Sequence, residues 1–249
     1  MGNRGRYAIV TPYFNEGRHL IEHCIRSVRA QTLTADHILV ADGHPQAWID
    51  SELVRHLKLD RNHANYGNTP RSLGALLAAS EGYDGIGLLD ADNWLEPDHV
   101  ACCVDAAGRV ENCDYVIARR NICRPDGSIF PIEDEGNERH VDTNCFFLLP
   151  GSYHVLPVFA LMPDEVAPLC DRMFYMALQA KDLIAIRLQQ KTVNYRSLWQ
   201  YAYEKAGEPA PPNAKPAVDV ERIRDWRGVR TPRQMEIFFR RSGFRFDIR

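Results

Sequence analysis

The sequence predicts an α/β protein with a mostly parallel central sheet flanked by helices. Over residues 1–120, short apolar segments alternate with segments of helical periodicity, which is the pattern of strand–helix–strand units. The 249 residues are 45% hydrophobic and 25% charged, as in ordinary soluble globular proteins. Such a chain is long enough for one large α/β domain.

Short apolar segments in this half are expected to be strands, because they are rich in aliphatic residues and turn residues follow several of them. They are residues 7–11, 37–41, 57–59, 85–89 and 115–118. Helices are expected between them. One begins at Arg18, where apolar residues recur with a helical period, and another covers 48–56. A third begins at Pro70 with Thr69 as its N-cap, and a fourth covers 97–108.

The second half of the chain is less regular. We expect, in order, a hairpin at 121–131, a charged loop at 133–139, a buried strand at 145–149, a helix at 165–188, a short strand at 192–195, a proline-rich linker at 207–216 and an amphipathic tail from 218. This pattern predicts one domain over residues 1–216, with its regular half at 1–120 and its irregular half at 121–216, followed by a helical tail at 217–249.

Asp90 and Asp92 follow the segment 85–89 and are one residue apart. Side chains alternate along a strand, so both carboxylates point to one side if the strand geometry continues. Neighbouring carboxylates repel each other unless a cation or strong donors lie between them. Oxygen-only ligands favour Mg²⁺ or Mn²⁺, which usually share their coordination shell with substrate phosphates. A polar turn after a core strand would show the same spacing, so the spacing alone leaves both interpretations open.

Acidic residues follow three of the predicted strands. They are Glu16, Asp42, Asp90 and Asp92. Open α/β sheets bind their ligands outside the carboxyl ends of the strands, so these four side chains are expected to converge on a ligand site.

Composition argues against several other classes of protein. The formal net charge of -3 argues against nucleic acid as the main ligand. No run of 18 clean apolar residues occurs and the N-terminus has no apolar signal region, so we expect no transmembrane segment. Seven cysteines without a Cys-x-x-Cys pair argue against a disulfide framework, and a cytoplasmic location is expected. The oligomeric state stays open.

Five short segments stand out together: residues 10–16 (VTPYFNE), 40–43 (VADG), 68–71 (NTPR), 88–93 (LLDADN) and, more weakly, 170–174 (CDRMF). In this order and spacing they resemble glycosyltransferase family 2. Members of that family have the GT-A fold, a Rossmann-like nucleotide-binding α/β domain. They are inverting transferases that use a nucleotide-sugar donor and usually a divalent metal. The resemblance implies that residues 1–120 bind the donor and residues 121–216 face the acceptor.

The resemblance also implies which residues contact the nucleoside. Asp42 resembles the carboxylate that accepts the N3–H of the donor's base, which points to a UDP-sugar. The backbone of Thr11 and Pro12, together with Glu16, would line the base and the ribose.

The same resemblance places the diphosphate and the metal. Arg71 resembles the residue that reaches the nucleotide. Asp90 and Asp92 correspond to the Asp-x-Asp motif, in which Asp90 contacts the nucleotide and metal and Asp92 is the more direct ligand of Mn²⁺ or Mg²⁺.

Asp171 resembles the general base at the start of the acceptor-side helix. Many family members have a second acidic residue just before the base, whereas this chain has Cys170. Asp164 and Glu165 are therefore alternative bases.

Three further polar residues are candidates for contacts with the acceptor or the donor sugar: Asp142, Asn144 and Arg172. The Gln-x-x-Arg-Trp motif of processive polysaccharide synthases is missing, so a non-processive transferase with a carbohydrate or other hydroxyl acceptor is expected.

Two alternatives remain at this point. A sugar-nucleotide-binding module without catalysis is compatible with the cysteine at position 170. An aspartyl-phosphate-type phosphatase also carries Asp-x-Asp after a strand, but it needs threonine or valine where this chain has Trp94.

Overall fold

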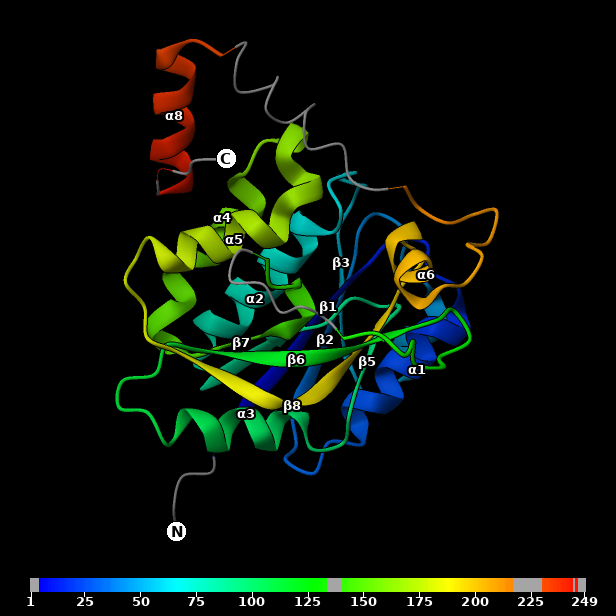
Figure 1. Ribbon diagram of the computed structural model, residues 1–249. Coiled ribbons are helices and arrows are strands. Elements are labelled where there is room, and N and C mark those ends of the chain that lie inside the picture. The colour runs from blue at the N-terminus through cyan, green and yellow to red at the C-terminus, as the bar shows by residue number, and fades with distance from the viewer. Residues whose placement is uncertain (1–4, 134–139, 217–229, 244, 246–249) are drawn as a thin grey trace.

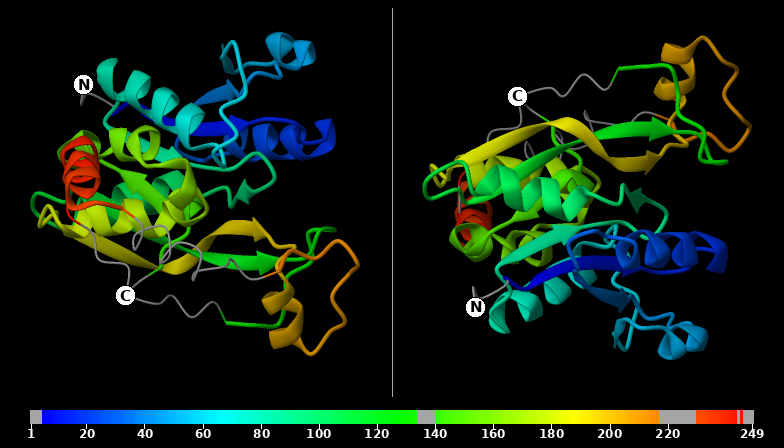
Figure 2. Two further views of the ribbon diagram at one scale, coloured as in Figure 1. Left: turned by 90° about the horizontal axis from the view of Figure 1, so that it is seen from above. Right: turned by 90° about the horizontal axis from the view of Figure 1, so that it is seen from below.

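The computed structural model describes residues 5–133, 140–216, 230–243 and 245. Within these ranges one eight-stranded sheet forms the centre of the molecule, in the order β3-β2-β1-β4-β7-β6-β8-β5 (Figures 1 and 2). Its strands are β1 (Tyr7–Tyr13), β2 (Asp36–Ala41), β3 (Arg55–Lys58), β4 (Gly85–Leu88), β5 (Trp94–Leu95), β6 (Tyr115–Cys123), β7 (Phe146–Leu148) and β8 (Ala185–Arg196). The four strands β3, β2, β1 and β4 are mutually parallel, as is the pair β6–β8. The predicted mostly parallel α/β architecture is confirmed.

Helices cover both faces of this sheet (Figure 1). They are α1 (Arg18–Arg29), α2 (Asn68–Ser80), α3 (His99–Ala107), α4 (Pro157–Leu161), α5 (Cys170–Gln179), α6 (Gln200–Ala206) and α8 (Pro232–Ser242). Helices α2, α4 and α5 lie on one face, and α1 and α3 on the other. The described helices and strands therefore form three layers, with the sheet in the middle.

Helix α2 lies unusually close to the sheet, and Gly74 is the reason. A Cβ atom built on Gly74 would lie 2.7 Å from Val10 and 2.8 Å from Val40, which is too close for any larger residue. The close approach brings the first turn of α2 to the carboxyl ends of β1 and β2.

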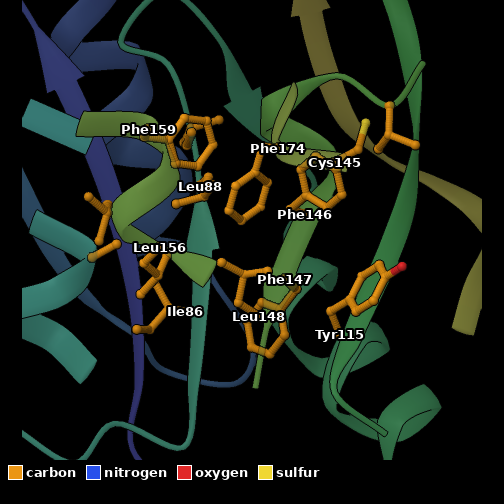
Figure 3. Close-up of a cluster of buried hydrophobic side chains, with 14 of the residues drawn as sticks. Ile86, Leu88, Tyr115, Cys145, Phe146, Phe147, Leu148, Leu156, Phe159 and Phe174 are labelled. Atoms are coloured by element: carbon orange, nitrogen blue, oxygen red, sulfur yellow. The ribbon is translucent and has the colours of Figure 1, made fainter. Parts of the chain in front are cut away.

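The core beneath α4 and α5 is aromatic (Figure 3). Phe159 stacks on Phe174 with ring centroids 4.2 Å apart, and Phe174 meets Phe146 edge to face at 5.3 Å. All three side chains are fully buried. Aromatic pairs of this kind contribute about 0.5–1.5 kcal/mol each beyond their buried area. They fix α5, and with it Asp171, against the sheet.

Two predictions for the first half are wrong in detail. The helix expected at 48–56 is only a 3₁₀ turn, η1 (Ala47–Ser51), because the following residues form the edge strand β3, where Arg55 pairs with Ile38. The N-cap of α2 is Gly67, with φ of 74°, and not Thr69. Thr69 lies inside the first turn, where its hydroxyl accepts a hydrogen bond from Asn65.

The helix expected at 165–188 is also wrong. A 3₁₀ helix, η4 (Asp164–Leu169), precedes α5, which ends at Gln179. From Ala185 the chain enters β8, because pairing with β6 across the sheet satisfies the backbone there. Residues 134–139 and 217–229 lie outside the described residues, so the predicted loop and the boundary at 216 stay predictions. The tail does contain the helix α8.

Candidate functional site

The carboxyl ends of β1, β2 and β4 and the start of α2 surround a cavity of about 470 Å³. Among its lining residues are Pro12, Glu16, Asp42, Arg71, Asp90 and Asp92. The sequence-predicted nucleotide and metal residues therefore share one space, with the exception of Thr11. The Thr11 side chain is buried on the α1 side of the sheet, where its hydroxyl lies 2.9 Å from the His37 ring.

Asp42 follows β2 directly and is almost fully buried. Its carboxylate accepts hydrogen bonds from His63, 2.6 Å from the ring Nδ1 and 3.1 Å from the backbone amide. Gly43 allows the turn that follows, because its φ is +79° and a Cβ there would meet the Asn62 backbone at 2.3 Å. The chain thus holds one carboxylate at the deep end of the cavity, with free acceptor capacity for a base N–H.

Asp90 is held on both of its oxygens. Oδ1 accepts from Arg71 Nη2 at 2.7 Å, and Oδ2 accepts from Asn144 Nδ2 at 3.0 Å. Arg71 is 3% exposed, and its other terminal nitrogen donates to Asn68 at 2.9 Å. The positive charge of Arg71 is therefore largely neutralised within the protein.

Asp92 contrasts with Asp90. Among the residues that the structure describes, no side chain donates a hydrogen bond to its carboxylate. Burial raises the pKa of Asp92 to about 7, and the negative charges of Asp90 and Glu16 add to that effect, whereas the positive charge of Lys215 acts in the opposite direction. A carboxylate in this state gains most from a bound cation.

The donor set fits a hard divalent cation. Carboxylate oxygens suit Mg²⁺ and Mn²⁺, and the raised pKa of Asp92 marks an unmet demand for positive charge. Within the described ranges no three His, Cys, Asp or Glu side chains are grouped as a complete metal site. A cation at Asp92 would therefore take other ligands from substrate phosphates and water, as Mg²⁺ commonly does.

A polar chain leads from Asp90 toward the second half of the molecule. The backbone amide of Asp90 donates to Asn144 Oδ1, and Asn144 Nδ2 also donates to Asp142 Oδ1 at 2.6 Å. Asp142 Oδ2 in turn accepts from Arg120. Asp142 and Asn144 are thus structural partners of the Asp-x-Asp turn, in addition to being candidates for sugar contacts.

Asp171 lies in the first turn of α5, as predicted. Its Oδ2 is 2.5 Å from His140 Nε2, and Oδ1 accepts from the Arg172 amide at 2.6 Å. The Arg172 side chain itself is exposed. The neighbouring Cys170 is buried, and burial raises the pKa of its thiol to about 12.

The alternative bases lie elsewhere. Asp164 and Glu165 are both exposed, and Glu165 forms an ion pair with Arg230 at 2.7 Å, ahead of α8. Among the described residues neither of them contacts His140, which orients Asp171.

Comparison with known proteins agrees with this geometry. The model of the family described as glycosyl transferase family 2 matches residues 8–162. The chain belongs to glycosyl transferase family 2. No curated protein sequence matches it.

The fold of this family 2 chain is similar to that of S. aureus TarS. The crystal structure of TarS residues 1–349 has a TM-score of 0.59 at 10% identity, over 77% of this chain and 60% of that one. The same fragment in complex with UDP gives 0.60 at 10% identity, over 81% and 63%. The complex with UDP-GlcNAc gives 0.58 at 9% identity, over 77% and 58%. The family 2 chain thus spans about three fifths of those fragments.

Two residues at the site were missed by the sequence interpretation. His63 binds the predicted carboxylate Asp42, and Lys215 lines the cavity at the ends of β1, β2 and β4. No local pattern marks His63, and Lys215 lies in a stretch that was interpreted as a linker. His140, which binds Asp171, belongs to the polar stretch 140–144 ahead of the buried strand and was expected to contact the acceptor or the sugar. Among the described residues, no helix is both long enough and apolar enough to span a membrane.

Proposed function

We propose that this chain is a non-processive, inverting glycosyltransferase that moves a sugar from a nucleotide-sugar, in the simplest case a UDP-sugar, to a hydroxyl acceptor. The observation that carries the proposal is the cavity in which the held carboxylate Asp42 and the free carboxylate Asp92 face the same space. Family 2 membership and the UDP and UDP-GlcNAc complexes of TarS support it.

The nucleoside would bind at the deep end of the cavity. Asp42, oriented by His63, would accept the N–H of the base, while Pro12 and Glu16 would line the base and ribose. Glu16 is fixed for this position because its Oε2 accepts the Phe14 amide at 2.7 Å. The diphosphate would then extend past the start of α2 toward Asp92.

Asp92, with Asp90 beside it, would hold Mg²⁺ or Mn²⁺, which when bound supplies positive charge for the leaving diphosphate. Residues of the chain itself order the turn on which this cation would bind. Arg71 and Asn144 keep Asp90 in place, so the turn that carries Asp92 is ordered before any ligand binds.

Asp171 would act as the general base. It would take the proton of the acceptor hydroxyl as that oxygen forms a bond to the anomeric carbon. The bond from that carbon to the diphosphate oxygen breaks, and the electron pair leaves with the diphosphate. Attack on the face opposite the leaving group inverts the configuration. His140 holds the carboxylate in one orientation for this step.

Two measurements on the purified chain test the proposal. Nucleoside diphosphates should raise the melting temperature in Mn²⁺ or Mg²⁺ and much less in EDTA, with UDP the most effective. Release of the nucleoside diphosphate from a panel of nucleotide-sugars should be detectable with added hydroxyl acceptors or with water.

The outcomes separate the alternatives. Equal shifts with and without metal for every nucleotide would contradict the proposal. Metal-dependent binding without any donor turnover would favour the sugar-nucleotide-binding module. The aspartyl-phosphate phosphatase alternative has no support from the family to which the chain belongs.

A further inference from the structure

Lys215 enters the nucleotide cavity from a segment far away in the sequence. The chain after α6 folds back, and the Lys215 amide donates to the Leu198 carbonyl at 2.7 Å. The Gln200 amide donates to the Lys215 carbonyl at 2.9 Å. These two hydrogen bonds form a bridge beside Trp199 and fix the Lys215 backbone.

That anchor is itself tied to the turn that carries the metal candidates. At the end of β8, the Arg196 amide donates to the Asn93 side chain at 2.8 Å. Asn93 is 1% exposed and follows Asp92 directly. The position of Lys215 relative to Asp92 is therefore set by two main-chain hydrogen bonds at Lys215 and by the bond from the Arg196 amide to the Asn93 side chain.

Two cationic side chains, Arg71 and Lys215, line the cavity, and they differ in what they already bind. Arg71 is buried and pairs with Asp90. Lys215 is exposed, and no carboxylate among the described residues forms an ion pair with it. Its Nζ lies over the face of the Trp199 indole, 5.7 Å from the ring centroid, near the outer limit for a cation–π interaction.

We propose that Lys215 is a phosphate-binding residue that contacts the diphosphate of the donor. This inference rests on the proposed nucleotide-sugar function. An ammonium on a flexible stem suits a phosphate group whose exact position changes when the sugar–phosphate bond breaks. The interaction also strengthens as charge builds on the leaving diphosphate, so it favours transfer as well as binding.

The test compares UDP with uridine, because only UDP carries the diphosphate. Binding to the full chain is measured by isothermal titration calorimetry in Mn²⁺ for the wild type, Lys215→Met and Lys215→Arg. We expect Lys215→Met to lower UDP affinity on the order of tenfold, as for a hydrogen bond to a charged group, and to leave uridine affinity unchanged. Lys215→Arg should retain most of the UDP affinity. Added salt should weaken UDP binding more in the wild type than in Lys215→Met.

Lys181→Met is the matched control, because Lys181 is exposed in the turn after α5 and lies outside the cavity lining. It should bind both ligands as the wild type does. Equal losses for UDP and uridine in Lys215→Met would overturn the inference in favour of a purely structural role. Unchanged UDP affinity in Lys215→Met would overturn this inference and leave the proposed function intact. A wild type that binds no nucleoside diphosphate would overturn both this inference and the proposed function.

Discussion

The cavity at the ends of β1, β2 and β4 and a second cavity beside β6 and β8 are both lined by charged side chains, but these side chains differ in the partners they already have. In the second cavity, of about 250 Å³, Arg120 pairs with Asp142 and His140 with Asp171. Arg187, also in its lining, donates to the Tyr175 hydroxyl at 2.8 Å. Arg119 pairs with Glu133 at 3.5 Å, so each charged side chain of this lining has an ion-pair or hydrogen-bond partner, although the partner of Arg187 is uncharged.

In the cavity at the ends of β1, β2 and β4, side chains of both signs lack an ion-pair partner among the described residues. Asp92 and Lys215 line the same space, and no ion pair with either of them is found among the described residues. A cavity with an unpaired anion and an unpaired cation is suited to a metal–diphosphate complex. A cavity whose charged side chains already have partners is suited to neutral, hydroxyl-bearing groups. This difference predicts that the metal–diphosphate complex binds on one side of Asn144 and that proton transfer from the acceptor takes place on the other side.

The largest expected effect is on turnover, through loss of the proposed general base. Asp171→Asn should lower turnover by on the order of 10²–10⁴ and change donor affinity by only a few fold, because the base acts on the acceptor and not on the nucleotide. Nucleoside diphosphate release and UDP titration measure the two quantities. Asp164→Asn and Glu165→Gln are the controls and should do far less. If Glu165→Gln abolishes turnover and Asp171→Asn does not, the base has been misassigned.

The next effect concerns stability without ligand, where Asp90 and Asp92 should behave in opposite ways. Asp90→Asn leaves the buried Arg71 guanidinium without its carboxylate, so the free energy of unfolding should fall by about 3 kcal/mol. Asp92→Asn removes one of two repelling charges and should leave stability equal or higher. Urea denaturation in EDTA measures both variants. Similar losses in the two would contradict the distinction between a held and a free carboxylate.

With ligand present, Asp92→Asn should instead become less stable than the wild type. The wild type should gain about 2.7 kcal/mol from a metal–UDP complex at a hundredfold excess over its Kd. Asp92→Asn should lose most of this gain, because it removes the free oxygen ligand. The measurement is the thermal shift with UDP in Mn²⁺ compared with EDTA. A shift in Asp92→Asn equal to that of the wild type would refute the metal assignment.

The most gradual effect is a pH dependence of the ligand-free protein. Burial, Asp90 and Glu16 raise the pKa of Asp92 from 3.8 to about 7 in the folded state. Between these values the folded state holds a proton that the unfolded state has lost. The free energy of unfolding should therefore fall as the pH rises from about 4 to about 7, on the order of 1 kcal/mol per pH unit. Urea midpoints in EDTA should show this slope in the wild type and a flatter profile in Asp92→Asn. Parallel profiles would show that another group is responsible.

The sequence by itself determined the nucleotide edge of the sheet. Asp42 and the Asp90–Asp92 pair come directly after parallel strands, and Arg71 lies in the first turn of the next helix. When strands are parallel, residues that follow them share one edge whatever the details of packing, so their convergence follows from local order along the chain. The resemblance to glycosyltransferase family 2 placed Asp171 near the start of a helix, although both ends of that helix were predicted wrongly.

Only the tertiary structure decided which of these residues are held and which are free. The contacts that distinguish Asp90 from Asp92 join Arg71 and Asn144 to one turn, across 19 and 54 residues of sequence. Lys215 reaches the cavity through a bridge to Trp199, from a stretch whose prolines and glycine suggested a linker. Such pairings depend on the order of strands in the sheet and on the bulged pairing of β6 with β8. Residue type and periodicity carry no information about them, because the same local pattern is compatible with many long-range partners.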